Sequence, residues 1–305
     1  IEEGGKTGLT AVTVANFLCF LWKFNKSLST NDSGVEDTTS GQFTQFTATG
    51  FDLPADTAGY VNYNSRTYAA WNWKINGGTT STDNNGSLTS TVQTNPEVGI
   101  SIATFNVPTQ ANFSFGHGLG SVPDMFWWKS RTNTQNWIVY HPAKTTSVPG
   151  RPGLYLNSQL AGFTTGGNWI TELSSTRIAI TDGQVSSGSN RDNVVYSFKS
   201  VEGFSKIGSY AGNGNADGTF IYTGFRPAWI LVKSYSHGEP WNLVDIERDT
   251  FNVMGNYLQP NTQGAEGTLA FVDSVSNGFK LRSSGSGFNG SGYSFSYMAF
   301  AEQPF

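Results

Sequence analysis

The sequence predicts an all-β protein with very little helix, built from tandem β-sandwich or jelly-roll-like units of about 100 residues each. Charged residues make up 13% of the chain and aromatic residues 14%, while residues that favour helices are scarce relative to Gly, Ser, Thr and Asn. Short apolar runs alternate with Gly/Asn/Ser clusters, as strands alternate with turns. Finally, part of the sequence occurs more than once, which is the signature of an array.

The repetition is clearest in two ungapped stretches, "PDMFWWKSRTNTQNWIV" and "PAWILVKSYSHGEPWNL". The second begins at Pro227, 104 residues after Pro123, where the first begins. The match continues to "LYLN" and "LQPN" at the same offset. The aligned residues are Lys129 with Lys233, Trp137 with Trp241, Leu154 with Leu258, and Asn157 with Asn261.

Residues 1–74 form the first unit, which is divergent or truncated. It contains "FLCFLWK" and "LSTN", but the asparagine follows the lysine after 8 residues rather than 28 (Lys23 to Asn31). The apolar stretch Thr7–Trp22 precedes this lysine. It is too short and too rich in Thr for a membrane span, and it has no cleavage site of a signal peptide. We therefore expect a buried strand there.

The remaining boundaries follow from composition and from the repeats. Residues 75–97 are rich in Gly, Ser, Thr and Asn, which predicts a flexible connector. Residues 98–199 form the second β-sandwich unit, residues 200–208 a short joint, and residues 209–305 the third β-sandwich unit.

Within each unit, the runs "FWWK" and "ILVK" suit a strand that is covered on both faces. The stretches "NVVYSFKS" and "YSFSYMAF" alternate in polarity, which predicts strands with one face in water. The clusters "SSGSN" and "SSGSGFNGSG" are typical of turns, because Gly and Asn adopt positive φ at low cost.

The third unit contains "GFRPAWILVK", "ERDTFN", "YLQPN", "SNGFKLR" and the terminal "YMAFAEQPF". This text resembles a repeat of large virion-appendage proteins of tailed bacteriophages, which are mostly described as tail-fibre or tail-associated structural proteins. "HGLGSVPDMFWWKSR" with "NWIVYH" resembles the preceding repeat. The resemblance covers residues 100–305 well and residues 28–74 in part. It implies a structural component of a virion and transfers no catalytic residue.

Charge and cysteine content narrow the choice of partners. A formal charge of −4 and a pI near 5.4 argue against nucleic acid, which requires a dense Lys/Arg surface. No basic amphipathic stretch favours an anionic membrane surface. The single cysteine, Cys19, cannot form an intramolecular disulfide, so stability must come from packing or from assembly with other chains.

No metal or phosphate site is predicted. The three histidines, His117, His141 and His237, do not have the spacing of metal ligands. The loops "GHGLG" and "GNGNADG" lack the helix and the Lys-Ser/Thr pair of a phosphate-binding loop. Asn213, Asn215 and Asp217 could offer oxygen ligands to calcium, but the pattern has fewer carboxylates than a calcium loop and no bidentate Glu.

Paired carboxylates of a glycan-cleaving enzyme were sought in "LVDIERDT". Asp245, Glu247 and Asp249 alternate, so they would share one strand face, with Arg248 on the other face unless a turn intervenes. Together with Lys233 and Arg226, they are better explained as a solvated edge that prevents sideways strand pairing. The aligned stretch of the second unit has no acid.

Tryptophans could stack on sugar rings, and six of them are candidates for such lectin platforms: Trp127, Trp128, Trp137, Trp169, Trp229 and Trp241. Trp137 and Trp241 recur in the same register, which favours core positions. Trp127 and Trp128 are neighbours, so at least one of them should be exposed or lie at a subunit contact if their strand has a single buried face. Trp71 and Trp73 share a face by the same period.

The sequence therefore predicts a non-enzymatic structural protein of a tailed-phage virion, without catalytic, cofactor-binding or metal-binding residues. We expect part of a tail fibre or tail-associated appendage that presents loops to the host surface and assembles with copies of itself, as a homotrimer, and with other virion proteins. A capsid decoration or head-fibre protein is the first alternative. A carbohydrate-binding or glycan-cleaving module that contacts a host cell-surface glycan is the second.

Overall fold

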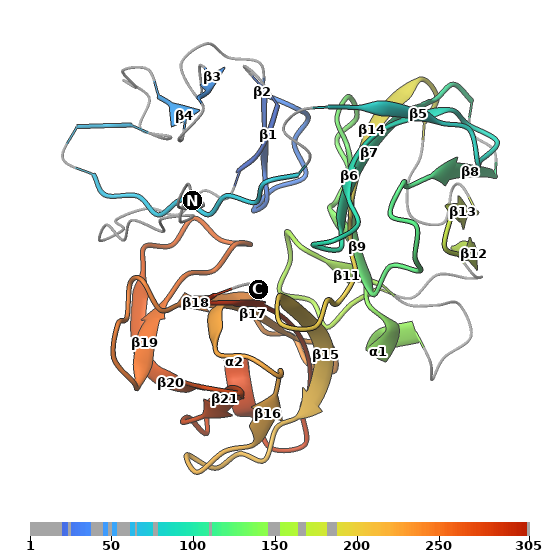
Figure 1. Ribbon diagram of the computed structural model, residues 1–305. Helices are drawn as coiled ribbons and strands as arrows, with labels where there is room; N and C mark the ends of the chain where they lie inside the picture. The colour runs from blue at the N-terminus through green and yellow to red at the C-terminus, as the bar shows by residue number, and fades with distance from the viewer. Residues whose placement is uncertain are drawn as a thin grey trace, which may run out of the picture.

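The structure is a computed structural model of the chain, and it describes residues 20–23, 26–37, 45–47, 51–53, 62–64, 66–75, 79–109, 112–145, 153–163, 169–181 and 188–303. The expected all-β fold is confirmed. Among these residues only two helices occur, α1 (Pro142–Thr145) and α2 (Ser286–Asn289), and each is a single turn. Figure 1 shows the strands gathered into three parts that meet near the middle of the molecule.

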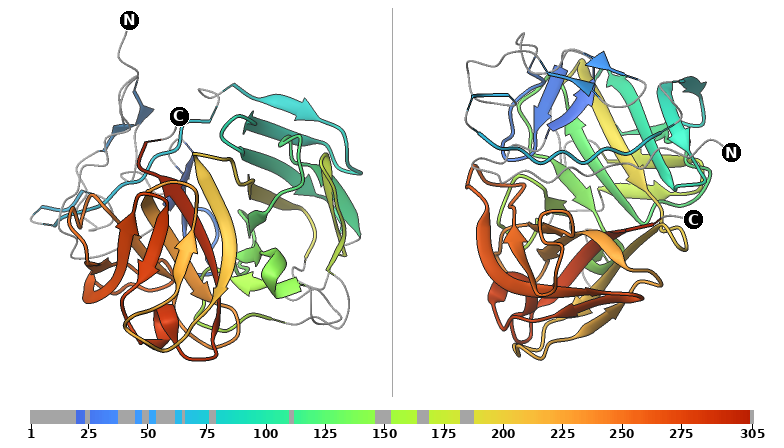
Figure 2. Two further views of the ribbon diagram at one scale, coloured as in Figure 1. Left: turned by 60° about the horizontal axis from the view of Figure 1, so that its bottom comes forward. Right: turned by 60° about the vertical axis from the view of Figure 1, so that its left-hand side comes forward.

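The first part, here called the N-terminal segment, comprises the described residues between 20 and 75. Its strands form two small antiparallel pairs, β1 (Phe20–Lys23) with β2 (Lys26–Ser29) and β3 (Gln45–Phe46) with β4 (Phe51–Asp52). Residues 66–75 lie outside the helices and strands, and Figure 2 shows this stretch, in light blue, running along the C-terminal part of the chain. The end of the expected strand Thr7–Trp22 lies in β1, and the rest of it, with Cys19, lies outside the described residues.

The second part, here called the middle sandwich, consists of two facing sheets. The larger sheet has the order β11-β10-β9-β14-β7-β6-β5, and the smaller one has the order β12-β13-β8. Their bounds are β5 (Ser81–Asp83), β6 (Ser90–Asn95), β7 (Ile100–Val107), β8 (Phe113–Gly116), β9 (Met125–Ser130), β10 (Ile138–Tyr140), β11 (Leu154–Tyr155), β12 (Ile170–Leu173), β13 (Arg177–Ile180) and β14 (Arg191–Phe198).

The predicted connector 75–97 is not a simple linker. Its residues form β5 and β6, and β6 pairs with β7 over five residues. Val92 of β6 is buried in the core between the two sheets of the middle sandwich. Polar β-branched side chains, such as those of Thr91 and Thr94, are as suitable for an outer strand as for a loop. The prediction of a flexible connector is therefore wrong for these strands.

The third part, here called the C-terminal sandwich, has two four-stranded sheets, β15-β22-β17-β18 and β16-β21-β20-β19. Their bounds are β15 (Ser205–Ala211), β16 (Phe220–Tyr222), β17 (Pro227–Ser234), β18 (Asn242–Asp245), β19 (Met254–Tyr257), β20 (Gly267–Val275), β21 (Gly278–Leu281) and β22 (Ser294–Ala301). Because β15 begins at Ser205, the predicted joint 200–208 is partly strand.

The two sandwiches have the same core strand order. The order β10-β9-β14-β7 of the middle sandwich corresponds to β18-β17-β22-β15 of the C-terminal one. Pairings recur at the offset seen in the sequence, since Trp128 faces Ile138 and Val232 faces Asn242. Likewise Val139 faces Leu154, and an isolated bridge joins Leu243 to Leu258.

The sheets that contain β9 and β17 are covered on both faces. Along β9, Phe126 and Trp128 face the core of the middle sandwich, while Met125 and Trp127 face a cluster that we call the central core. The central core also receives side chains of β17, β18 and β22 from the C-terminal sandwich and Leu28 from β2. All six residues of β9 and all eight of β17 are buried as a result.

This double coverage confirms the expectation for "FWWK" and "ILVK". The same coverage overturns the expectation that "NVVYSFKS" and "YSFSYMAF" each have one face exposed to solvent. Those strands, β14 and β22, lie in the middle of their sheets, and Val194 and Met298 face the central core rather than water. Ser197, Ser296 and Tyr297 of these strands are buried, and Tyr196 is partly buried against the central core, so most of the polar residues in the alternation lie away from solvent.

Candidate functional site at the central core

Two buried lysines link the parts of the chain around the central core. Lys129 stands near the end of β9 and Lys233 near the end of β17, and both are almost fully buried. Lys129 Nζ donates to the carbonyl oxygens of Ser130 (2.8 Å) and of Ser33 in the N-terminal segment (3.3 Å). Lys233 Nζ donates to the carbonyl oxygens of Glu239 and of Gln159 in the middle sandwich (3.0 Å). Each ammonium group thus binds a loop of the preceding part.

Burial changes the acid–base properties of these lysines. Loss of solvation lowers the pKa of Lys129 to about 8, although the nearby Asp32 raises it. Burial lowers the pKa of Lys233 to about 7, with the charge of Lys144 adding to this effect and that of Glu239 opposing it. Lys144 Nζ in turn donates to the carbonyl of Tyr235 (2.6 Å), so lysines cross the junction between the sandwiches in both directions.

Two tryptophans repeat the same pattern of contacts. The indole Nε1 of Trp137 donates to the carbonyl of Ser29 (2.8 Å), and that of Trp241 donates to the carbonyl of Tyr155 (2.9 Å). Their backbone amides bind the side chains of Asn157 and Asn261, in both cases at 2.9 Å. The acceptors Ser29 and Ser33 have the same spacing as Tyr155 and Gln159. The aligned "LSTN" and "LYLN" stretches therefore play equivalent roles at successive junctions.

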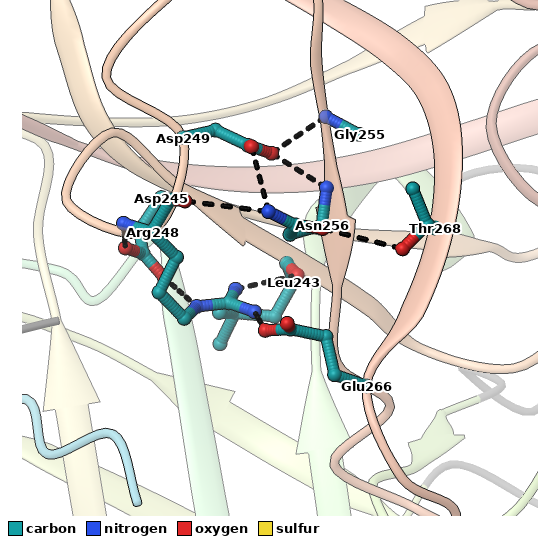
Figure 3. A network of polar contacts seen from close by, with 8 residues as sticks. All are labelled: Leu243, Asp245, Arg248, Asp249, Gly255, Asn256, Glu266 and Thr268. Carbon is teal, nitrogen blue, oxygen red and sulfur yellow. Dashed lines mark hydrogen bonds and ion pairs between the residues drawn. The ribbon is translucent and has the colours of Figure 1, made fainter. Parts of the chain in front are cut away.

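An ion-pair network closes the third junction, between the C-terminal sandwich and the N-terminal segment. Arg248 binds Asp245 Oδ2 through Nε (2.6 Å) and Glu266 Oε2 through Nη1 (2.5 Å), and its side chain is almost fully buried (Figure 3). Its guanidinium carbon lies 5.9 Å from the ring centroid of Trp71. Trp71 also packs on Leu258, and Thr30 Oγ1 donates to the carbonyl of Pro260 (2.7 Å).

The same network fixes the loop that follows β18. Asp249 accepts hydrogen bonds from the backbone amides of Gly255 (2.6 Å) and Asn256 (2.5 Å) and from the Asn256 side chain (2.7 Å), as Figure 3 shows. Asn252 binds both backbone groups of Ser274 on β20 at 2.9 Å. The loop is therefore fixed on both sides of Phe251, whose side chain is 85% exposed.

These contacts overturn the prediction that Asp245, Glu247 and Asp249 form one solvated edge. Strand β18 ends at Asp245, and the chain turns there, with the Arg248 amide bound to Asp245 Oδ1 (3.0 Å). Asp245 is buried, Glu247 is exposed, and Asp249 binds the next loop. A strand period of two does not continue through a turn. Arg248 holds Asp245 and Glu266 in ion pairs, and Asp249 accepts three hydrogen bonds, so the oxygen atoms of these side chains are engaged within the fold.

The loop that could have bound calcium has its oxygen atoms already engaged. Asn213 Oδ1 accepts from the Asn215 amide (3.0 Å) and from Asn289 Nδ2 (2.8 Å), and Asn215 Oδ1 accepts from the Asp217 amide (2.9 Å). Asp217 pairs with Lys280 at 2.7 Å. A calcium ion needs several such oxygens turned towards one centre.

Each histidine is accounted for by its local environment. His117 is buried between the carbonyl of Ser174 (3.1 Å) and the amide of Leu119 (3.2 Å), and burial lowers its pKa. Burial also lowers the pKa of His141, to about 4. His237 stacks on Tyr293 with centroids 3.5 Å apart. Within the described residues, no three His, Cys, Asp or Glu side chains are grouped as a metal site requires.

The glycine-rich loops form turns. Gly118 and Gly120 of "GHGLG" have φ of 68° and 74°, which an L side chain rarely adopts. No helix follows either this loop or "GNGNADG". Among the helices of the described residues, none has the length and apolarity needed to cross a membrane.

All six tryptophans proposed as sugar platforms are buried. The core assignment of Trp137 and Trp241 is confirmed, and the idea that Trp127 or Trp128 is exposed is wrong because their sheet is covered on both faces. Trp73 packs edge-on against Trp229 at 5.6 Å and lies 5.3 Å from Phe300. Sequence reasoning missed the Arg248 network, since the partner Glu266 lies in a separate loop with no matching motif.

Comparison with known proteins gives one family. The profile of a family described as a domain of unknown function (DUF7483) matches residues 21–304. No curated protein and no solved structure matches the chain. The family match covers both sandwiches and most of the N-terminal segment together.

Proposed function

We propose that this chain, which belongs to the DUF7483 family, is a non-enzymatic structural protein of a tailed-phage virion, part of a tail fibre or tail-associated appendage. The resemblance of residues 100–305 to virion-appendage repeats is the starting point. The predicted location is therefore the extracellular phage particle, and the predicted partners are other virion proteins and further copies of the chain.

The observation that carries this proposal is the use of buried charge at the junctions. Lys129, Lys233 and Arg248 each bind groups from different loops or parts of the chain, and they hold those parts together. Catalytic groups need access to a substrate, whereas these groups are enclosed. An arrangement of this kind suits a rigid body whose task is mechanical and geometric.

The exposed loop around Phe251 supports the second half of the proposal, the presentation of loops to a host surface. A solvent-exposed aromatic side chain gains free energy when a partner covers it. Asp249 and Asn252 hold the loop in place, so little conformational entropy is lost on contact.

Labelling of the phage particle tests the location. Antibodies raised against residues 209–303 should label the tail or its fibres in electron micrographs of purified particles. Label spread over the capsid would instead support the decoration or head-fibre alternative. Particles that contain none of the chain by mass spectrometry would contradict a role in the virion.

Self-assembly is tested separately. We expect assembly because the chain is rich in aromatic residues and cannot form an intramolecular disulfide, and we expect a homotrimer because the resemblance points to fibres. Sedimentation equilibrium at micromolar concentration should give three times the mass of 33.0 kDa. A single species at the monomer mass would contradict assembly of this chain alone.

A further inference from the structure

Two neighbouring aromatic side chains stand in solvent on the outer face of the C-terminal sandwich. Phe220 and Tyr222 belong to β16, and 45% and 65% of their surfaces are exposed. Ile221 between them is buried in the sandwich core. Strand β16 is the outermost strand of its sheet, at the lower edge of Figure 1. The two rings are thus fixed on one face of a rigid strand, on a surface that the rest of the chain leaves open.

The neighbouring strand, β21, places a glycine next to these rings. Tyr222 faces Gly278 of β21, and Phe220 faces Lys280. A Cβ atom at Gly278 would lie 2.9 Å from Cζ of Phe220, so the Phe220 ring extends over this glycine. The glycine therefore allows a continuous aromatic surface where another residue would raise a side chain between the rings.

A chain of charged groups borders the aromatic surface. Lys280 Nζ lies 2.7 Å from Asp217 Oδ1, Arg282 Nη1 lies 3.9 Å from the same oxygen, and Arg282 Nε binds Asp273 at 2.5 Å. The Asp217 side chain is 79% exposed. These four groups carry two positive and two negative charges, so the border offers both donors and acceptors without a net charge.

Hydrogen bonds from a buried side chain hold the loop of this border in place. Asn289 of α2 is fully buried, and its Nδ2 donates to Asn213 Oδ1, to the Asn215 carbonyl and to the Ser283 carbonyl, at 2.8, 2.8 and 2.9 Å. Its Oδ1 accepts from the Asn213 amide (2.9 Å). The loop that carries Asp217 is therefore ordered before any ligand arrives, which reduces the entropic cost of binding.

We propose that this surface, defined by Phe220, Tyr222, Gly278, Lys280 and Asp217, binds a sugar ring of a neutral polysaccharide. The C–H face of a pyranose ring is apolar and stacks on aromatic rings, while its hydroxyl groups both donate and accept hydrogen bonds. Because the border has no net charge, its electrostatic potential does not favour an anionic polysaccharide over a neutral one.

The size of the surface also favours a sugar over a protein partner. Stable protein interfaces bury at least about 1,000 Å² in total. Two partly exposed aromatic side chains contribute a small part of that, since even a whole aromatic side chain buries only about 150–250 Å². One or two sugar rings match the surface.

The proposal rests on the proposed function for its biological setting, a host glycan contacted by a virion. Binding is nevertheless tested on the purified chain. A failure to bind sugar would leave the location on the particle untouched, and a chain absent from particles could still bind sugar.

Affinity electrophoresis provides the test. The full chain is run through native gels that contain dextran, galactomannan or xylan as neutral polysaccharides, or hyaluronan as an anionic one. We expect retardation by at least one neutral polymer, and Tyr222→Ala should weaken it about tenfold or more. Tyr63→Ala, which removes an exposed aromatic ring of the N-terminal segment, should leave retardation unchanged. Near-UV circular dichroism shows whether each variant remains folded.

Two results would overturn the proposal: no retardation by any of the neutral gels, whether or not hyaluronan retards the chain, or equal retardation of Tyr222→Ala and the parent chain. Asp217→Asn provides a second, independent variant, because it keeps the shape of the side chain and removes its charge. Weakened retardation of this variant supports the border as part of the site, and unchanged retardation removes Asp217 from it.

Discussion

At the scale of single residues, buried lysines connect stability to pH in this protein. Lys129 and Lys233 hold their ammonium groups among backbone carbonyls, where burial disfavours the charged form. When the pKa of a lysine is lower in the folded chain than in the unfolded chain, folding costs free energy at every pH at which the folded chain keeps that lysine protonated. The sign of the pH dependence follows from this.

Stability should therefore rise with pH above neutrality. Lys233 has a pKa of about 7 in the folded chain and 10.5 ordinarily, so between these values the unfolded chain holds a proton that the folded chain has lost. The free energy of unfolding should increase from pH 7 to pH 9.5, by at most about 1.4 kcal/mol per pH unit for this group, and should be lowest below pH 7. Urea unfolding across this range measures the slope.

The variant Lys233→Met should flatten the slope, and Lys206→Met, which changes an exposed lysine, should not. Above about pH 10, tyrosines reverse the trend, because burial raises the pKa of Tyr297 to about 12. An unchanged slope in Lys233→Met would assign the pH dependence to other groups.

Arg248 should be the most sensitive charged residue of the C-terminal sandwich. Removal of its side chain leaves the buried Asp245 carboxylate and the largely buried Glu266 carboxylate without the guanidinium group that pairs with both. We expect Arg248→Ala to lower the free energy of unfolding by about 3–5 kcal/mol. Arg226→Ala, which breaks an exposed pair with Glu302, should cost less than about 1 kcal/mol. Similar costs for both variants would show that the network contributes little.

At the scale of secondary-structure elements, strands β9 and β17 determine how the molecule is built. Their unbroken apolar sequences predicted coverage on both faces, and the structure confirms it. The sequence could not indicate what lies on the second face, because the partners of Trp127 and Leu231 come from other parts of the chain. For the same reason, the polar alternation of β14 and β22 predicts a solvent-exposed face where the structure has a buried one.

Turns limited the prediction in other elements. The alternation of Asp245, Glu247 and Asp249 resembles a strand, but β18 ends at the first of them. The stretch 75–97 has the composition of a linker, yet β6 pairs with β7, whose residues lie 5 to 13 positions further on, and β5 pairs with β6. A turn overrode the alternating pattern in the first case, and pairing with another strand overrode local composition in the second.

Trp241 should be essential for joining the two sandwiches. It is almost fully buried in the central core and its indole binds the Tyr155 carbonyl of the other sandwich. We expect Trp241→Phe to cost about 1–3 kcal/mol through the lost hydrogen bond, and Trp241→Ala about 3–5 kcal/mol through the cavity. Phe251→Ala should change stability by less than about 0.5 kcal/mol. Thermal and urea unfolding measure all three, and a Trp241→Ala variant as stable as Phe251→Ala would contradict this role.

At the scale of the whole molecule, the central core joins segments that the sequence divides into separate units. Residues of the N-terminal segment, the middle sandwich and the C-terminal sandwich all contribute to it. The 104-residue echo predicted a central strand in each sandwich, and β9 and β17 lie there. It did not predict that the outer faces of the sheets would pack on one another, since a repeat carries no information on the arrangement of its copies.

The C-terminal sandwich should therefore be incomplete when produced alone. A fragment of residues 200–305 exposes Trp229, Leu231, Trp241 and Met298, which the full chain buries in the central core. We expect it to melt at lower temperature than the full chain and to bind the dye 8-anilinonaphthalene-1-sulfonate. A monomeric fragment that binds no dye and matches the melting temperature of the full chain would show that the sandwich is self-sufficient.

The shared core also constrains how such a chain can change during evolution. Recombination at the boundary near residue 204 would bring a foreign sandwich against the old Trp137, Leu154 and Phe198. The hybrid would pack well only if the donor sequence carried side chains that complement these residues in the central core. Inheritance of the two halves should accordingly be linked, and exchange should be tolerated mainly at outward loops such as the one that carries Phe251.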